Sequence, residues 1–185
     1  DDLDDGITEV MVGPQPSLGH DRNIALEEAN GDYIICWDDD DWSHPRRMGV
    51  QVNLAIRYEC PVTLRNQIRY SFRTGNAYAY KVKLRPGYDV GIPGTVCHPK
   101  TDFRYAAEDM HEDTHFLQQF KTVRILENIP QLYLRFFTGY NVWHEKHIMG
   151  SYSWGSNRVD LGKTTHAYLK QVLSEHYSFA IGVAQ

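Results

Sequence analysis

Four consecutive aspartates at positions 38–41 follow directly on an apolar run, 33–37, and are closed by Trp, Ser and a His-Pro pair. Apolar runs rich in β-branched and aromatic residues predict a buried strand. Side chains alternate between the two faces of a strand, so Asp38 and Asp40 are expected on the same side. Two carboxylates on one side suit Mg²⁺ or Mn²⁺, whose remaining ligands are commonly phosphate and water oxygens. The pattern therefore predicts a metal site for a phosphate ester at a strand end.

An acidic run can also be an ordinary solvated loop. The strand before the aspartates weighs against that interpretation, as do His44 and Pro45, which would fix the turn after them. Trp42 has two interpretations as well. It either packs in the core beneath the site, which is favoured, or stacks on a sugar.

The chain of 185 residues is 42% hydrophobic and 23% charged, enough for one globular domain with a sizeable core. Its net charge of −5 offers no general basic face, so nucleic acid is not an expected partner. No apolar run is long enough to span a bilayer. The three cysteines are widely spaced and odd in number, which argues against a disulfide framework or a zinc site and favours the cytoplasm.

Hydrophobic periodicity predicts an α/β protein. Strands are expected at 7–12, 33–37, 62–72, 77–84, 93–98 and 123–137, the last interrupted at a proline. Helices are expected at 24–29, 45–58, 112–120 and 164–179. The first strand, helix and second strand fit a parallel βαβ unit, and open sheets of this kind bind ligands beyond the carboxyl ends of their strands. The aspartates would lie at such an end.

Local signals define several of these elements further. Asp21 is a candidate N-cap for the first helix, and Gly31 a candidate stop. The Thr-Gly-Asn sequence at 74–76 predicts a hairpin between the third and fourth strands. Apolar residues recur on one side of the second helix, which is expected to cover the sheet; they are Met48, Val52, Ala55 and Ile56.

Three blocks of the sequence together resemble the family-2 inverting glycosyltransferases of the GT-A fold. The most specific is GHDRNIALEEANGDYIICWDDDDWSHPRRM at 19–48, with an Arg-Asn helix start and an Asp-x-Asp element. HEDTHFL at 111–117 and YLRFFTGYNVW at 133–143 follow in the expected order. The resemblance implies a Rossmann-like mixed sheet flanked by helices. It also implies one partial GT-A domain over 1–185, with its core at 7–143 and a C-terminal helical extension at 151–185.

The resemblance assigns the aspartates to donor binding. Asp40 would bind a divalent metal, Mn²⁺ or Mg²⁺, that carries the donor diphosphate. Asp38 would approach the donor ribose or join the metal shell, and Asp39 would lie beside the bound nucleotide. Arg22, at the start of the first helix, would line the donor pocket, although a plain surface arginine is an open alternative. His144 and His147 are weaker candidates for a late metal or diphosphate contact.

The resemblance also implies a catalytic base. Asp113 matches the family's Glu-Asp motif and would take a proton from the acceptor hydroxyl as that oxygen attacks the anomeric carbon. Glu112 would orient Asp113 or contact the acceptor. Both could instead be helix-start carboxylates that favour the helix dipole. Glu108 and Asp109 form a rival pair one turn earlier, but no Thr-x-Phe-Leu sequel follows them.

The chain departs from the family pattern at its beginning. It lacks an opening strand with a Pro-x-Tyr-Asn-like motif and a second strand ending in Asp-Asp, which in the family bind the nucleotide base. By this comparison we expect an N-terminally truncated GT-A domain. Strand edges would then be exposed, so a homo-oligomer or another partner that covers them is expected. The QxxRW acceptor motif is also absent, which disfavours a processive synthase.

The main hypothesis is a metal-dependent inverting glycosyltransferase. It would move a sugar from a nucleotide-diphosphate sugar, most often a UDP-sugar in this family, to a saccharide or glycolipid acceptor in the cytoplasm or at the inner face of the membrane. The alternative is a non-catalytic, truncated GT-A fragment that serves as a binding or oligomerisation module. A nucleotidyltransferase is disfavoured because no Gly-rich loop with a Lys is visible to cradle a triphosphate.

Overall fold

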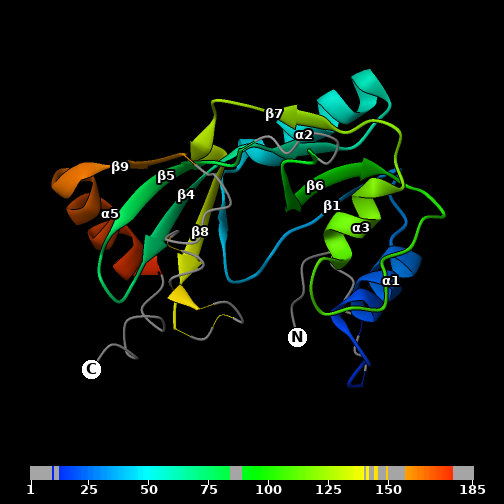
Figure 1. Ribbon diagram of the computed structural model, residues 1–185, viewed down its shortest axis with the longest axis horizontal. Coiled ribbons are helices and arrows are strands. Elements are labelled where there is room, and N and C mark those ends of the chain that lie inside the picture. Colours follow the sequence, from blue (N-terminus) through cyan, green and yellow to red (C-terminus); the bar gives the residue numbers. More distant parts are fainter. Residues whose placement is uncertain are drawn as a thin grey trace.

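The computed structural model describes residues 10, 13–83, 89–139, 141, 144–145, 149 and 157–176. Two mixed β-sheets lie next to each other and are flanked by helices (Figure 1). The α/β class predicted from the sequence is therefore confirmed. Almost all of the expected strand at 7–12 falls outside the described residues, so the parallel unit that it would begin stays a prediction.

The first sheet has the strand order β1-β6-β3-β7. Its strands are β1 (Tyr33–Ile35), β6 (Ile92–Pro99), β3 (Val62–Leu64) and β7 (Arg124–Leu126). All neighbours are antiparallel except β3 and β7. Side-chain alternation gives this sheet two apolar faces. Cys97 packs with α2 (Arg46–Tyr58), whereas its neighbour Val96 packs with α1 (Leu18–Glu28) and α3 (Glu112–Gln118).

The second sheet has the strand order β2-β8-β4-β5-β9. Its strands are β2 (Trp42–Ser43), β8 (Tyr133–Phe137), β4 (Asn66–Ser71), β5 (Ala77–Lys81) and β9 (Asn157–Asp160), and a short 3-10 helix, η1 (Pro130–Leu132), leads into β8. The β4–β5 hairpin was predicted, while β9 was not. Leu169 and Leu173 of α5 (Gly162–His176) pack on the apolar face of this sheet, so α5 is amphipathic as expected.

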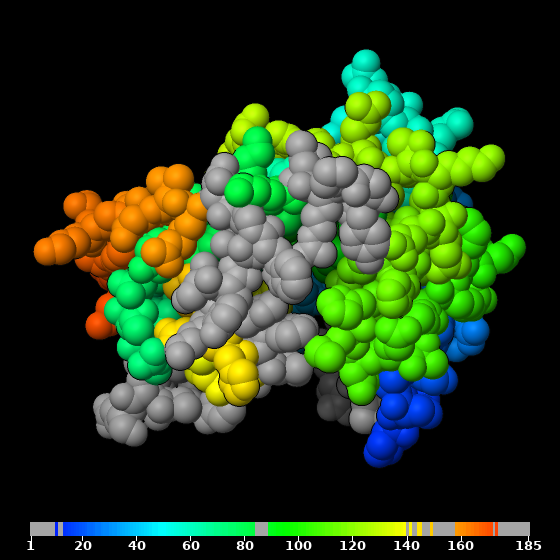
Figure 2. All heavy atoms as spheres, viewed as in Figure 1, coloured from blue at the N-terminus to red at the C-terminus, as the bar shows by residue number. Residues whose placement is uncertain are grey.

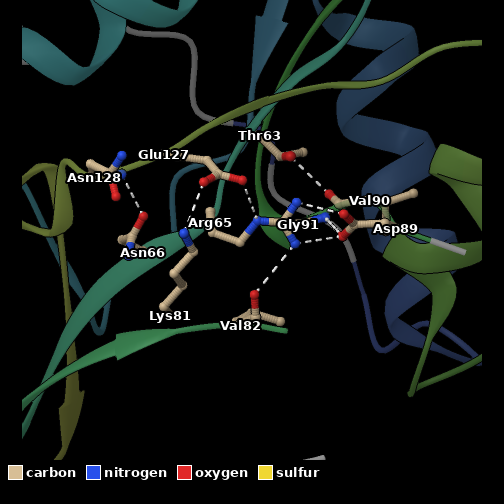
Figure 3. A network of polar contacts seen from close by, with 10 residues as sticks. All are labelled: Thr63, Arg65, Asn66, Lys81, Val82, Asp89, Val90, Gly91, Glu127 and Asn128. Atoms are coloured by element: carbon tan, nitrogen blue, oxygen red, sulfur yellow. Dashed lines mark hydrogen bonds and ion pairs between the residues drawn. The ribbon is translucent and has the colours of Figure 1, made fainter. Parts of the chain in front are cut away.

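The prediction of one long strand at 62–72 was wrong, because the chain divides at Arg65 between the two sheets. Arg65 is buried and forms ion pairs with Asp89 and Glu127, and Lys81 joins Glu127 from β5 (Figure 3). A buried guanidinium needs charged partners and a full set of acceptors. This network therefore stabilises the point at which the chain passes from one sheet to the other.

Two details of the helices correct the sequence predictions. Helix α1 begins at Leu18 with Ser17 as N-cap, so Asp21 lies in its first turn and is not the cap. The earlier start follows from a close backbone approach: a Cβ at Gly19 would lie 1.8 Å from the carbonyl oxygen of Ala106. Only glycine allows that approach. It places α1 against the segment that leads into α3.

The buried face of α2 also differs from the prediction. Met48 and Ile56 are half exposed, although both were expected to cover the sheet. The face that packs on the sheet instead carries Arg47, Gln51 and Ala55. Periodicity finds apolar stripes, and it fails here because two polar side chains are buried with their hydrogen bonds satisfied.

The described helices include none that is both long and apolar enough to cross a membrane. All three cysteines are free.

His98 is a buried, titratable residue of the core. Its side chain projects from strand β6, is fully buried against the rings of Phe116 and Phe120, and has no hydrogen-bond partner for Nε2 among the described residues. Burial lowers the pKa of His98 below its ordinary 6.5. As pH falls below 6.5 the unfolded chain therefore takes up a proton that the folded chain resists, and stability is lost.

We expect His98→Leu to reduce this acid sensitivity. Urea unfolding at pH 7.5 and pH 5 should show a smaller drop in the free energy of unfolding for the variant than for the parent. The difference should not exceed about 1.4 kcal/mol per pH unit below 6.5. Equal pH dependence in both proteins would mean that His98 titrates normally in the folded state.

Candidate active site

The four aspartates lie in a turn and not on a strand. Strand β1 ends at Ile35, and Asp39 and Asp40 occupy the turn that leads into β2. The expected alternation of carboxylates along a strand was therefore wrong. Asp38 is half-buried, Asp39 and Asp40 are exposed, and Asp41 is buried.

Asp41 anchors the turn to the second sheet. Its Oδ2 accepts a hydrogen bond from the Tyr133 hydroxyl, and its Oδ1 accepts one from the backbone N–H of Phe136 at 2.9 Å. Burial raises the pKa of Asp41 to about 6, against the lowering effect of these two bonds and of Arg135. The Tyr133 hydroxyl also lies 3.3 Å from Oδ2 of Asp38, so one phenol contacts both carboxylates. Asp41 is a structural residue of the turn.

Asp38 and Asp40 keep carboxylate oxygens available at the surface. The Asn141 amide donates to Oδ2 of Asp40 at 2.9 Å. Burial raises the pKa of Asp40, and the charge of Asp38 raises it further. A divalent cation would relieve this repulsion between like charges. Among the described residues no group of three or more His, Cys, Asp and Glu forms a metal cage, so a cation here would rely on substrate and water oxygens, as Mg²⁺ and Mn²⁺ commonly do.

Arg47 lies beneath the turn. It is fully buried, and its guanidinium donates to Gln51 Oε1 at 2.9 Å, to Ser43 Oγ at 2.7 Å and to the carbonyl oxygen of Cys36 at 2.9 Å. These contacts join α2, β2 and the end of β1. The guanidinium thus contacts the chain on both sides of the turn that carries Asp38–Asp41, which we call the acidic turn. It fixes the separation of the two ends of this turn.

The acidic pair of α3 lies close to α1. Glu112 is buried and accepts a hydrogen bond from Nε of Arg22 at 3.1 Å. Burial raises the pKa of Glu112, and the neighbouring charge of Asp113 adds to the rise. Asp113 is half-buried and contacts the Thr114 hydroxyl at 3.2 Å. Glu112 is therefore held within the protein, while Asp113 keeps an accessible carboxylate.

The rival pair has structural partners. Asp109 accepts a hydrogen bond from the backbone N–H of Leu18 at 2.9 Å, at the start of α1. Glu108 lies 3.4 Å from Nδ1 of His115. Both carboxylates therefore already have partners at the surface between α1 and α3.

Cys36 precedes the four aspartates and contacts Arg22 of α1, which also pairs with Glu112 of α3. Its Sγ lies 3.6 Å from Nη1 of Arg22 and 3.5 Å from the Tyr105 hydroxyl. Burial raises the pKa of its thiol, and the charges of Asp38 and Asp113 raise it further. Both carboxylates therefore lie within electrostatic range of one side chain, although 75 positions separate them in the sequence.

Arg22 supplies the positive charge at this meeting point. Burial alone would lower the pKa of Arg22, but the charges of Cys36, Tyr105, Asp38 and Glu112 raise it above its ordinary value. Its guanidinium is engaged with α3 and lies over the Tyr105 ring, 5.6 Å from the centroid. Its predicted role in the donor pocket stays a prediction.

Other candidates are placed as follows. Trp42 packs against the apolar cluster of the second sheet, which agrees with a core role. Trp37 was not singled out from the sequence, yet it is 47% exposed beside the turn with Arg47 behind its ring. His144 is exposed, and His147 lies outside the described residues. In the space-filling view α1 and α3 form one end of the molecule, and β9 with α5 the other (Figure 2).

The pattern of glycosyl transferase family 2 matches residues 4–173 of the chain. The chain belongs to this family. Family 2 membership confirms the resemblance carried by the acidic turn and the Glu-Asp pair. A solved structure, S. aureus TarS 1-349, is similar at 14% identity with a TM-score of 0.45, and the match covers 65% of this chain and 40% of that one. No curated protein matches the sequence.

Proposed function

We propose that the chain carries the active site of a metal-dependent inverting glycosyltransferase. It would transfer a sugar from a nucleotide-diphosphate sugar, a UDP-sugar in our proposal, to a hydroxyl of a saccharide or glycolipid. One observation carries the proposal: the Arg22 guanidinium contacts both Cys36, two residues before the first aspartate of the turn, and Glu112 of α3. In our proposal the aspartate turn would bind the donor and Asp113 would act as base, both at one site of this family 2 domain.

Asp38 and Asp40 would hold the cation, Mn²⁺ or Mg²⁺, with Asp39 beside the nucleotide. When bound, such a cation supplies Lewis-acid stabilisation of the leaving diphosphate. The chain itself does the positioning. Asn141 fixes the carboxylate of Asp40, and the Asp41–Tyr133 contact fixes the turn on the second sheet.

Asp113 would accept the proton of the acceptor hydroxyl as its oxygen attacks the anomeric carbon opposite the leaving group. Glu112 is buried and paired with Arg22, so we assign it the orientation of α3 and not contact with the acceptor. Arg22 then links α3, through Glu112, to Cys36 at the start of the acidic turn.

Calorimetric titration with UDP tests the donor site. We expect Mn²⁺ to strengthen UDP binding to the parent chain, because the cation bridges the turn and the diphosphate. Asp40→Asn should remove most of this metal dependence, about tenfold or more in affinity, since it removes one charged ligand. Asp32→Asn, an exposed aspartate before β1, is the matched control. An affinity for UDP that changes neither with Mn²⁺ nor in the Asp40→Asn variant would refute the assignment.

A further inference from the structure

Trp37 is a large aromatic side chain at the surface, and the roles proposed for the carboxylates leave it unused. It directly precedes Asp38, the first residue of the acidic turn, and it is 47% exposed. Within the described part of the chain its indole N–H has no hydrogen-bond partner, and no aromatic ring packs against its own. Single exposed apolar side chains are common on protein surfaces, so the surroundings of Trp37 must decide its role.

Arg47 holds one face of the Trp37 ring. The guanidinium carbon lies 5.1 Å from the ring centroid. The guanidinium is itself fixed by hydrogen bonds to Gln51, Ser43 and the carbonyl oxygen of Cys36. A cation over an indole face is attractive and restricts the orientation of the ring. Because one face is covered, the exposure belongs to the other face and the ring edge, where a flat molecule could stack with little loss of side-chain entropy.

Side chains before the acidic turn alternate between the two faces of the first sheet. Ile35 packs in the apolar cluster of α2, Cys36 packs in that of α1 and α3, and Trp37 again lies against α2. Asp113 belongs to α3. The acidic turn therefore has Trp37 on one side of the sheet and the proposed base on the other.

This arrangement gives the two ends of the proposed donor different surroundings. The anomeric carbon has to lie where the base can activate the acceptor hydroxyl, so the sugar end of the donor would face Asp113. The diphosphate would lie at Asp38 and Asp40. The nucleoside leaves the diphosphate in the direction opposite to the sugar, which is towards α2 and Trp37. Every nucleobase has a π-face that can stack on an aromatic side chain.

We propose that Trp37 is the stacking platform for the nucleobase of the sugar-nucleotide donor. This inference rests on the proposed function and adds to it the side chain that binds the nucleoside part. Trp37 contributes to donor affinity and takes no part in proton transfer. Its indole N–H is available to an oxygen of the nucleoside, since it has no partner among the described residues.

Calorimetric titration in the presence of Mn²⁺ tests the platform with two ligands, UDP and ribose 5-diphosphate, which is UDP without its base. We expect Trp37→Ala to weaken UDP binding about 5–150-fold, because the base loses its stacking partner. Binding of ribose 5-diphosphate should not change. Trp37→Tyr should keep most of the affinity for UDP, whereas Trp37→Leu, which is apolar but has no π-face, should recover little of it.

Tyr168→Ala, which removes an exposed aromatic ring from α5, is the matched control and should bind both ligands as the parent does. Unchanged UDP affinity in Trp37→Ala would overturn the proposal. An equal loss of affinity for both ligands would also overturn it, because Trp37 would then act through the shape of the acidic turn. Failure of the proposed function appears separately, as UDP binding to the parent that does not depend on Mn²⁺. If the parent binds no UDP at all, neither proposal stands.

Discussion

Asp113→Asn is expected to lower the rate of sugar transfer by about 10²–10⁴-fold while leaving UDP binding unchanged. A positioned general base contributes about that factor, and an amide cannot accept the proton. Asparagine has nearly the same shape as aspartate and can still accept from the Thr114 hydroxyl, which now lies 3.2 Å away. The fold of α3 should therefore persist, and the loss should appear in the chemical step.

The rate of transfer is measured as UDP release, in the presence of acceptor, from the nucleotide sugar that binds best. UDP binding is measured by calorimetry. Asp109→Asn is the matched control, because this rival carboxylate receives the N–H of Leu18 and has a structural partner. The control should cost some stability at the start of α1 but little turnover. If Asp109→Asn abolishes transfer and Asp113→Asn does not, the base has been misassigned. Equal, unchanged rates in both variants would exclude a carboxylate base from this segment.

The sequence predicts the secondary structure well where a local signal decides it. The Thr-Gly-Asn turn, the apolar run of β6 and the Glu-Asp start of α3 all lie where they were expected. It fails where the deciding contact is distant. The aspartates were expected on a strand because the apolar run before them has no local stop. In the structure the backbone leaves the sheet after Ile35, and Asp41 finds its partner in Tyr133, 92 positions later.

In the candidate site, too, local motifs point to some residues, whereas only distant contacts explain others. The resemblance assigns roles to Asp38, Asp40, Glu112 and Asp113 from their motifs, and these roles stay predictions. The residues that contact these side chains were not visible in the sequence. Asn141 and Tyr133 lie within a matching block, and only their hydrogen bonds with Asp38, Asp40 and Asp41 give them a role.

Arg47 is the clearest residue that sequence patterns miss. An arginine at the start of a helix is expected on the surface. Its burial becomes understandable only with three acceptors from different elements: the side chains of Gln51 and Ser43, and the carbonyl of Cys36. Burial lowers its pKa, against the charges of neighbouring groups that include Asp38, so the guanidinium is held at a cost in desolvation.

We expect Arg47→Met to destabilise the fold by about 3 kcal/mol. Methionine fills much of the volume but leaves buried acceptors at Gln51, Ser43 and Cys36 without a donor, at about 1–3 kcal/mol for each group that cannot relax. The measurement is the free energy of unfolding in urea. Arg46→Met is the matched control, since Arg46 is exposed on the same turn of α2 and should change stability by less than about 0.5 kcal/mol.

The same variant separates two opposing physical effects. If the hydrogen bonds of Arg47 outweigh its desolvation, Arg47→Met loses stability, the two ends of the acidic turn separate, and Mn²⁺-dependent UDP binding weakens with them. If desolvation outweighs the hydrogen bonds, the methionine variant is as stable as the parent or more so, as happens when some buried ionic groups are replaced by apolar ones. Weak UDP binding in a variant of unchanged stability would then show that the buried charge is retained to shape the aspartate turn, and not to stabilise the fold.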